Sequence, residues 1–497
     1  MLFNSVQFLI FFPVVCLIYY AIPKKIRWIW LLLASYYFYM CWNPKYALLM
    51  LTSTVITWLS GVFIDRFGRI ENEQKSKRLK NATVAVSFIS NLTILFMFKY
   101  FNFAVDTLNR VLSHFDIALI TPGFDVILPV GISFYTFQAL GYTMDVYRKD
   151  IPSEKNLFRY MLFVSFFPQL VAGPIERSKN LLHQLREYHS FDKSDVKNGL
   201  LLMLWGFFQK LVIADRAAIA VNAVYNNYTD FGAIELIIAT ILFAIQIYCD
   251  FSSYTDIAKG AAQVMGIRLM DNFRRPYFSR SIAEFWRNWH ISLSGWFRDY
   301  LYIPLGGNRH GKIRKYINIM IVFLASGLWH GANMTFVVWG FLHGIYQIIG
   351  DATKNIRLKL MGLFSVNEKS HSHRFVQRII TFTLVCFGWI FFRANSLSDS
   401  LNIIKKIFSG LNPWILTNGG LLGFGFDGYQ WFVFAAAVLV LFSVSCFHYY
   451  NVCIREKILS ENIFIRWIIY FTMIFTVLIF GIYGPGYDES QFIYFQF

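Results

Sequence analysis

Long runs of apolar residues alternate with short clusters of Lys and Arg along this chain. The runs Trp431–Phe447 and Trp467–Tyr483 contain no charged residue, and each is close to the roughly 20 residues that a helix needs to cross a bilayer core. In lipid, a single apolar segment satisfies its backbone polar groups as a helix. The pattern therefore predicts an all-α polytopic membrane protein.

The basic loops between these runs indicate how the chain is threaded, because Lys and Arg accumulate on the cytoplasmic side of a membrane. Lys24, Lys25 and Arg27 place one loop inside, and the basic residues within 65–80 place the next one inside. The alternation then puts residues 484–497 outside. The segments predicted to cross are 8–20, 28–42, 46–64, 82–104, 126–144, 198–222, 232–252, 379–392, 430–448 and 467–483.

Three further segments depart from the simple pattern. Residues 160–174 are apolar with charge on both flanks, which predicts a re-entrant element. Residues 259–315 combine many cations with Trp, Phe and Tyr, so they are expected to lie in the membrane interface or to dip into it from the cytoplasmic side. Residues 316–349 lie between cationic loops and predict a helical hairpin that opens inward, broken near Gly327–Ala332.

Composition supports a membrane protein and excludes other classes. Hydrophobic residues make up 56% of the 497 residues and charged residues only 15%, against about 25% in soluble domains. The net charge of +17 lies in loops and not in a separate basic domain, so nucleic acid is not an expected partner. The six cysteines lack CxxC spacing, so neither a disulfide framework nor a metal site is expected. Residues 8–20 lack a preceding basic region and are expected to remain as a span.

Histidine is the most informative residue type, because ionisable groups inside a membrane are costly and suggest function by default. Four of the ten histidines lie in or beside apolar segments, namely His290, His330, His343 and His448. His330 has glycines close on either side and no charge between Lys315 and Asp351. A desolvated neutral imidazole there is suited to accept a proton from a hydroxyl group. A buried structural histidine bonded to a carbonyl is the alternative.

The other histidines have weaker claims. His290 lies in a segment whose helical wheel, read as one continuous helix, puts Arg287, Ser294 and Arg298 on one face and aromatic residues on the other. This is either an ordinary interfacial helix or a cationic cleft for an anionic donor. His343 lies about 20 Å from His330 along a straight helix, which favours packing or orientation. His448 precedes a basic loop and is interpreted as interfacial.

The sequence contains no GxSxG, HExxH or P-loop signature. Asp250 and Asp256 are candidates to orient a base or bind a cation, although capping or pairing with Lys259 explains them equally well. Charges within residues 210–216 make the crossing at 198–222 irregular.

Several longer motifs resemble a known family. Phe285–Gly307 (FWRNWHISLSGWFRDYLYIPLGG) followed by Gly327–Gly331 (GLWHG) is similar to the membrane-bound O-acyltransferase (MBOAT) family, and more narrowly to its bacterial alginate O-acetylation branch. The opening MLFNSVQFLIFF, Phe167–Glu176 (FPQLVAGPIE) and Asn272–Pro276 (NFRRP) match that branch as well. The resemblance thus runs from end to end.

The resemblance implies one domain over residues 1–497, with about 10–12 transmembrane helices and re-entrant and interfacial helices around a central funnel. Residues 259–349 would be its catalytic region, with His330 as the catalytic residue and His290 as its partner near the donor. Five neighbouring side chains are predicted to support them: Trp329, Asn288, Ser294, Asp299 and His343.

The tail, Asp488–Phe497, resembles the C-terminal acyl-relay motif of related bacterial systems, in which a tyrosine takes the acyl group and passes it to an exported partner. By that resemblance Tyr494 is the relay candidate. An aromatic tail anchored at the interface is the alternative.

The resulting hypothesis is acetyl transfer from cytoplasmic acetyl-CoA, a co-substrate and not a bound cofactor, to an exported polysaccharide. An extracytoplasmic acetyltransferase partner is expected, and the location is the bacterial cytoplasmic (inner) membrane, among membrane lipids. Alternatives are a D-alanyl carrier protein or a long-chain acyl-CoA as donor, and a polytopic transporter. The residues predicted to bind the donor are Arg274, Arg275, Arg287 and Arg298.

Overall fold

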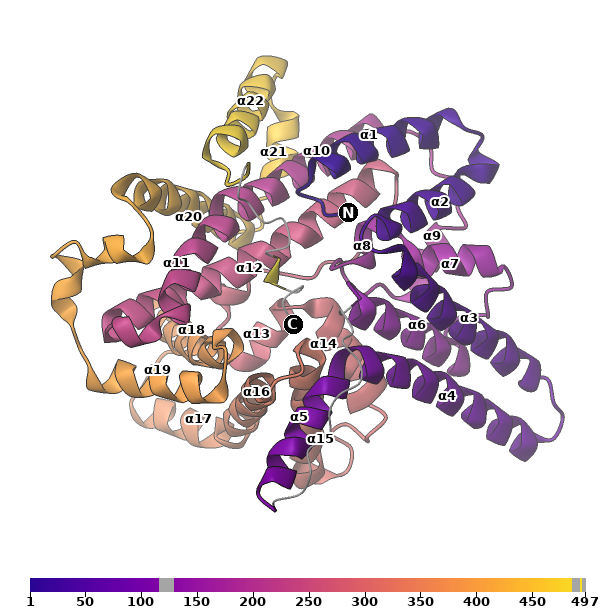
Figure 1. The fold of residues 1–497 in the computed structure, drawn as a ribbon, viewed down its shortest axis with the longest axis horizontal. Helices are drawn as coiled ribbons and strands as arrows, with labels where there is room; N and C mark the ends of the chain where they lie inside the picture. The colour runs from indigo at the N-terminus through magenta and orange to yellow at the C-terminus, as the bar shows by residue number, and fades with distance from the viewer. Residues whose placement is uncertain (116–128, 485–491, 494–497) are drawn as a thin grey trace. The chain divides into compact units, whose positions relative to one another are not determined.

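The computed structural model describes residues 1–115, 129–484 and 492–493 of the chain (Figure 1). Helices form all of the regular structure in these residues, and no strand occurs among them. The prediction of an all-α protein is thus confirmed for the described ranges. By its internal contacts the chain divides into two compact units: Met1–Leu200 with Ile257–Met270, and Leu201–Asp256 with Asp271–Phe497. That the whole chain forms one domain stays a prediction.

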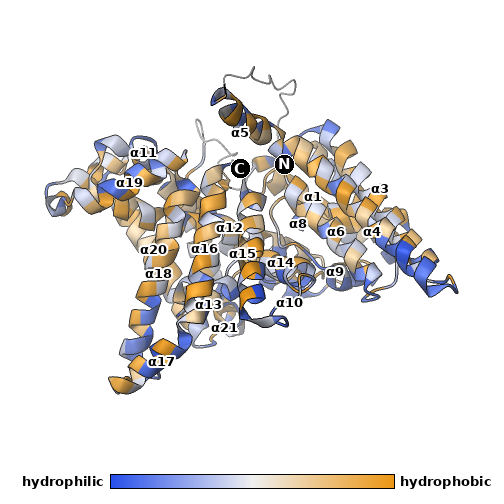
Figure 2. Ribbon diagram, turned by 90° about the horizontal axis from the view of Figure 1, so that it is seen from below, coloured by the Kyte–Doolittle hydropathy of each residue, from blue (hydrophilic) through white to orange (hydrophobic). Residues whose placement is uncertain are grey.

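Seven helical stretches in the described residues are long and apolar enough to cross a membrane, judged by length and composition. They are Pro44–Phe67, Glu73–Ser113, Lys193–Asn226, Ala233–Val264, His371–Arg393, Gly428–Tyr449 and Ile463–Phe480. The apolar helix α1 (Val6–Ala21) is shorter. Each predicted crossing lies mostly on helix in the described residues, although residues 41–42, 129–131, 232 and 481–483 at the ends of four of them are not helical. Residues 126–128 lie outside the described residues. In Figure 2, α16 (Met334–Ala352) is orange over most of its length, whereas one end of α4 (Glu73–Leu95) is blue.

The first unit is built from the N-terminal helices. Besides α1 and α4 these are α2 (Arg27–Met40), α3 (Pro44–Phe67), α5 (Phe101–Ser113), α6 (Ile132–Tyr147), α7 (Leu157–Ser165), α8 (Phe167–Leu170) and α9 (Ser178–Gln184). A π-helical turn, η2 (Phe96–Tyr100), joins α4 to α5. The helix α10 (Lys193–Phe207) and the long α12 (Ala233–Val264) contribute residues to both units. Helices α7 and α8 are separated by Phe166, whose backbone is not helical, which fits the predicted re-entrant element at 160–174.

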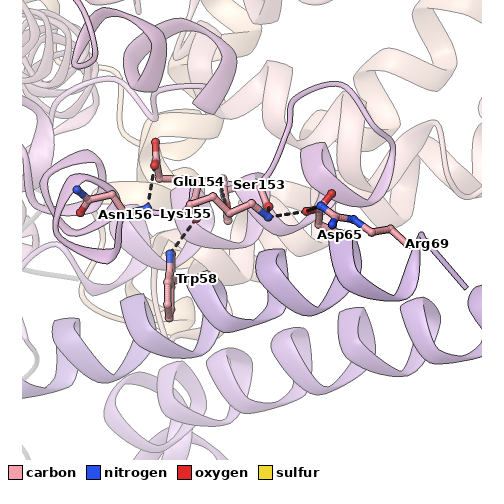
Figure 3. A network of polar contacts seen from close by, with 8 residues as sticks. Trp58, Asp65, Arg69, Ser153, Glu154, Lys155 and Asn156 are labelled. Carbon is pink, nitrogen blue, oxygen red and sulfur yellow. Dashed lines mark hydrogen bonds and ion pairs between the residues drawn. The ribbon is translucent and has the colours of Figure 1, made fainter.

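A polar network joins the end of α3 to the loop after α6 (Figure 3). Lys155 pairs with Asp65, which also accepts a hydrogen bond from Arg69 at 3.2 Å. The indole N–H of Trp58 donates to the carbonyl of Glu154 at 2.9 Å. The ion pair thus brings together Asp65, near the end of α3, and Lys155, in the loop after α6.

The second unit contains the C-terminal helices. Besides α16 these are α11 (Asp215–Asn226), α13 (Ile282–Asn288), α14 (Ile291–Phe297), α15 (Gly311–His330), α17 (Lys354–Leu363), α18 (His371–Arg393), α19 (Leu397–Ser409), α20 (Gly428–Tyr449), α21 (Ile454–Ser460) and α22 (Ile463–Phe480). Two π-helical turns, η3 (Phe208–Ala214) and η6 (Arg298–Tyr302), interrupt the longer helical stretches. The segment 259–315, predicted to be interfacial, holds only short helices after α12 ends.

The helices α15 and α16 form the predicted hairpin, with the break at residues 331–333 (Figure 1). They approach closely because glycines face each other: a Cβ on Gly327 would lie 3.4 Å from the Cα of Gly340 and would overlap the carbonyl oxygen of Phe336. A Cβ on Gly340 would overlap the carbonyl oxygen of Phe323. Small residues that allow such approach are typical of packed membrane helices.

We expect Gly340→Ala to separate α15 from α16, because the added methyl group meets a backbone oxygen and not a flexible side chain. Overpacking of this kind costs about 1–3 kcal/mol of the free energy of unfolding. Thermal unfolding of the purified protein in detergent measures the loss. Gly350→Ala on the same helix is the control, since its Cβ would meet no atom within 4 Å. Equal unfolding temperatures for the two variants would contradict the packing argument.

Candidate active site

His330 is the last residue of α15, at the turn into α16. The turn is tight, because a Cβ on the following Gly331 would overlap the ring of Phe336. Asn333 then starts α16 by accepting the N–H of Thr335 at 3.0 Å. The local sequence, a glycine followed by a capping asparagine, therefore fixes where His330 stands.

The imidazole of His330 is surrounded by aromatic rings. Its side chain is buried, and ring centroids of Trp329 and Trp339 lie 5.0 Å from that of His330. Phe392 of α18 follows at 5.3 Å. All three rings meet the imidazole edge to face, an arrangement that aromatic groups favour. Three separate helices or turns thus hold one histidine in an apolar environment.

His290 lies beside His330, as predicted, with 6.3 Å between the two ring centroids. It is completely buried, and the rings of Phe251 and Trp329 lie 4.7 and 5.7 Å away. Burial lowers the pKa of His290 to about 3, because the charged form would lose its hydration. The imidazole is therefore neutral at pH 7. The structure brings the two histidines of the motifs into one site.

The prediction of one continuous helix around His290 was wrong. Helix α13 ends at Asn288 and α14 begins at Ile291, and His290 between them has a left-handed backbone with φ of 45°. Few residues other than glycine adopt this conformation, and it persists where the surroundings hold it. The wheel that assigned Arg287 and Arg298 to one face therefore does not apply.

Asn272 holds this strained turn and was not singled out from the sequence. Its carbonyl accepts the N–H of Ile291 at 2.9 Å, and its side-chain oxygen accepts the N–H of Ser292 at 3.2 Å and the hydroxyl of Ser292 at 2.9 Å. The Nδ1 of His290 lies 3.2 Å from the same oxygen. The Ser292 N–H can only donate, so the Asn272 atom is an oxygen and His290 carries its hydrogen on Nδ1.

This tautomer leaves Nε2 of His290 as the unprotonated ring nitrogen. A second backbone bond, from the N–H of Arg274 to the carbonyl of Asn288 at 2.9 Å, ties the two segments together. In the sequence, the signal that could have pointed to Asn272 was its place as the first, polar residue of the motif Asn272–Pro276, next to an apolar residue.

The five predicted supporting residues differ in position. Trp329 contacts both histidine rings. The buried Nδ1 of His343 accepts the indole N–H of Trp286 at 3.2 Å, and its ring lies 5.0 Å from Trp339. His343 therefore belongs to the aromatic packing around the site.

The other three supporting residues make polar contacts of their own, and the N–H of Ser294 donates to the carbonyl of His290 at 2.9 Å. The side chain of Asn288 donates to Ser279 at 3.2 Å, and Asp299 forms an ion pair with Arg298 at 2.8 Å. Ser294 lines a cavity together with Arg298.

The four predicted donor-binding arginines have different partners. Arg275 donates to the carbonyl of His448 and its guanidinium lies 5.6 Å from the ring of Tyr449. Exposed Arg274 pairs with Asp271 at 3.4 Å. Arg287, also exposed, donates to the backbone of its own helix.

Arg298, the fourth of these arginines, is 68% exposed and lines a cavity of about 150 Å³. Of the four, it is therefore the one that the structure places at an opening beside the α15 helix.

Two cavities lie close to the segment that carries His330. One is the cavity that Arg298 lines, and its lining also includes Ser326, one turn before His330 on α15. The other, of about 450 Å³, is lined by Ala332 and Asn333, which follow His330, and by Phe392, the ring neighbour of His330. His330 itself is buried and lines neither of these two cavities. Tyr494, the relay candidate, lies outside the described residues.

The chain is similar in sequence to several known proteins. Residues 74–359 match the model of the MBOAT, membrane-bound O-acyltransferase family. The chain is 37% identical to a probable alginate O-acetylase of Pseudomonas aeruginosa, over 92% of this chain and 84% of that protein. It is 32% identical to a peptidoglycan O-acetyltransferase of Helicobacter pylori (83% and 80%). It is 27% identical to a teichoic acid D-alanyltransferase of Bacillus subtilis (54% and 70%).

We expect Asn272→Leu to release the turn at His290. The replacement has a similar volume but leaves the buried donors of Ser292 without their acceptor, at a cost of about 1–3 kcal/mol each. Thermal unfolding should show lower stability, and acyl transfer per folded molecule should fall at least tenfold. Asn288→Ala is the control, because that side chain makes a single bond to Ser279. An Asn272→Leu protein with unchanged activity would show that this tie does not matter for the site.

Proposed function

Because the chain belongs to the membrane-bound O-acyltransferase family, we propose that it moves acetyl from cytoplasmic acetyl-CoA to an acceptor outside the cytoplasmic membrane. The acetyl group is proposed to reach an exported cell-surface polysaccharide, either an alginate-like polysaccharide or peptidoglycan. The protein is a multi-pass membrane O-acyltransferase; the acetyl donor, the direction and the acceptor are what is proposed. The observation that carries the proposal is the position of His330, which is buried beside His290 and has close chain neighbours that line two cavities.

The donor is proposed to enter from the side of the basic residues before α15. Acetyl-CoA carries several phosphate charges, and Arg298 is exposed at the smaller cavity, which extends to Ser326. The segment Arg309–Lys315, which includes the first turn of α15, adds cations on the side that positive-inside topology assigns to the cytoplasm. Only the thioester arm needs to reach His330, so no CoA crosses the membrane.

The reaction requires one acyl transfer and two proton transfers, one to His330 and one from it. His330 removes the proton from the acceptor hydroxyl, and the resulting oxygen attacks the thioester carbonyl. The new C–O bond forms as the C–S bond breaks, and the CoA thiolate takes the proton back from His330. The products are an acetyl ester and free CoA, and the base ends neutral. His290 is neutral and is held by Asn272. It therefore places a second imidazole next to His330 without placing a charge there.

The acceptor enters from the opposite side, through the larger cavity. Its wall includes the polar side chains of Asn333, Thr335 and Asn395. The direct acceptor is either a sugar hydroxyl or the phenol of Tyr494. A phenol is the better leaving group, so an acetyl-tyrosine would pass its acyl group to an exported transferase partner that acetylates the glycan.

Relatives also define the main alternative. One relative is a teichoic acid D-alanyltransferase, at 27% identity and over 54% of this chain, so a D-alanyl carrier is a rival donor. The alginate O-acetylases at 36–38% identity and the peptidoglycan O-acetyltransferase favour acetyl. A long-chain acyl-CoA donor is a further alternative with less support, whereas the family match excludes the transporter alternative.

We expect His330→Ala to lower acetyl transfer by about 10²–10⁴-fold, the contribution of a positioned general base. Purified protein in vesicles with radiolabelled acetyl-CoA gives the rate. A D-alanyl carrier and palmitoyl-CoA in parallel test the donor class. His343→Ala is the matched control, since His343 serves packing: it should destabilise the protein yet keep activity per folded molecule within about tenfold. Full activity of His330→Ala would exclude the base role.

Replacing Tyr494 by Phe separates the two acceptor routes. The change removes only the phenolic oxygen, so the aromatic tail is kept while no acetyl ester can form on it. We expect loss of most acetylation of the exported glycan in cells, measured by mass spectrometry of the polysaccharide. Unchanged acetylation would mean that the glycan is the direct acceptor and that the tail is only an anchor.

A further inference from the structure

A buried ion triad lies in the second unit. Lys210 of η3 is paired with Asp215 at 2.8 Å and with Asp250 of α12 at 2.5 Å. All three side chains are less than a tenth exposed. These charges made the crossing at 198–222 irregular in the sequence. Asp250, for which pairing with Lys259 was one explanation, finds its cation in Lys210.

The triad is attached to the tail of the chain. One carboxylate oxygen of Asp250, Oδ1, faces Lys210, and the other, Oδ2, accepts the backbone N–H of Ile493 at 2.8 Å. The ring of Phe492 lies 5.7 Å from the ammonium of Lys210 and 4.9 Å from the ring of Tyr254. Phe492 and Ile493 are only 2% and 3% exposed. Two residues of an aromatic tail are therefore bound inside the protein.

The same π-helical turn holds the chain before the tail. In η3 the N–H of Asp215 donates to the carbonyl five residues back, that of Lys210, so the usual pairing of α-helical carbonyls is broken. The carbonyl of Leu211 accepts the N–H of Ile482 at 3.0 Å, just after α22. η3 is therefore attached to the C-terminal chain at two points. Its Leu211 accepts the N–H of Ile482, and the ammonium of its Lys210 lies over the ring of Phe492.

The docked tail also reaches the proposed acceptor side of the active site. Ile493 lines the 450 Å³ cavity together with Asn333 and Phe392, and Phe392 contacts the ring of His330. Tyr494 is joined directly to Ile493, and consecutive Cα atoms are about 3.8 Å apart. Holding Ile493 therefore limits how far the phenol can move from this cavity wall.

We infer that Lys210, Asp215 and Asp250 form a dock for the chain's own tail, and that Asp250 is a positioning residue that holds the tail for acyl transfer. The positioning role rests on the proposed function, since it needs Tyr494 as acceptor; the docking does not. Lys210 orients Asp250 so that one oxygen is left for the tail. A backbone N–H is the recognised group, so the dock fixes the main chain and leaves the side chain at 494 available.

The test compares full-length variants that differ in this single bond. Ile493→Pro removes the N–H that Asp250 accepts, and Ile493→Ala is the matched control, because it shortens the side chain but keeps the N–H. Asp250→Asn changes the bond from the other side. Thermal unfolding shows that each protein is folded. Hydrogen–deuterium exchange of the C-terminal peptide then reports docking without any reference to activity.

We expect the tail amides to exchange at least tenfold faster in Ile493→Pro and Asp250→Asn than in the wild type, with a smaller change in Ile493→Ala. Acetylation at Tyr494, detected by mass spectrometry after incubation with acetyl-CoA, should fall at least tenfold in Ile493→Pro. Hydrolysis of acetyl-CoA, which needs no tail, should stay within about threefold. A merely structural role would lower both reactions together.

The outcomes separate the dock from the proposed function. Unchanged exchange in Ile493→Pro and Asp250→Asn would overturn the dock. Faster exchange with unchanged acetylation of Tyr494 would overturn the positioning role. A wild-type tail that is protected from exchange but never acetylated would refute the tyrosine relay and the positioning role with it, while supporting the dock.

Discussion

Every buried polar group in a membrane protein has to find its partner within the protein, because lipid offers none. That requirement shapes the active site at Asn272. One side-chain oxygen accepts both donors of Ser292 and faces Nδ1 of His290, and the backbone at His290 takes a left-handed conformation to make this possible. The same requirement accounts for the triad at Lys210, where two carboxylates share one ammonium group. Both features are polar clusters in apolar surroundings, and each has a long-range attachment to hold it.

The aromatic residues have a complementary role. Trp289, Trp339 and Trp389 are almost completely buried, and the rings of Trp339 and Trp389 lie 6.0 Å apart in a stacked arrangement. Such large rigid side chains exclude water and fix the orientation of the groups between them. His330 and His343 both contact Trp339, but of the two it is His330 whose ring lies 6.3 Å from that of His290. Position within one aromatic cluster thus distinguishes a histidine suited to chemistry from one that packs.

Much of the fold could be predicted from the sequence, because the signals for it are local. Apolar runs and basic loops specify the crossings, and the glycines of GLWHG indicate the break in the α15–α16 hairpin. His330 and His290 stood out for a related reason, as ionisable residues in apolar context within recognisable motifs. Their proximity in space came from the resemblance alone and is confirmed by the 6.3 Å between their rings.

The parts that could not be predicted depend on contacts between distant positions. Asn272 acts on residues eighteen to twenty positions away, and no periodicity marks such a bond. The helical wheel assumed that one helix runs through His290. The helix is interrupted there, because contacts with Asn272 stabilise a strained backbone conformation at His290. Asp250 and Lys210 are forty positions apart, so the sequence showed two isolated charges where the structure has one ion pair.

The π-helical turn η3 has a consequence for the way substitutions in this region act. A π turn amounts to an α-helix with one extra residue, and each residue of an α-helix turns the chain by about 100°. The wide turn absorbs this extra residue, so α11 keeps nearly the rotational phase relative to α10 that a regular helix one residue shorter would give it. A residue added to or removed from the regular helix on either side is not absorbed in this way, and it would rotate Asp215 and Arg216 by about 100° relative to α10. The number of residues in this stretch is therefore as strict a constraint as its composition.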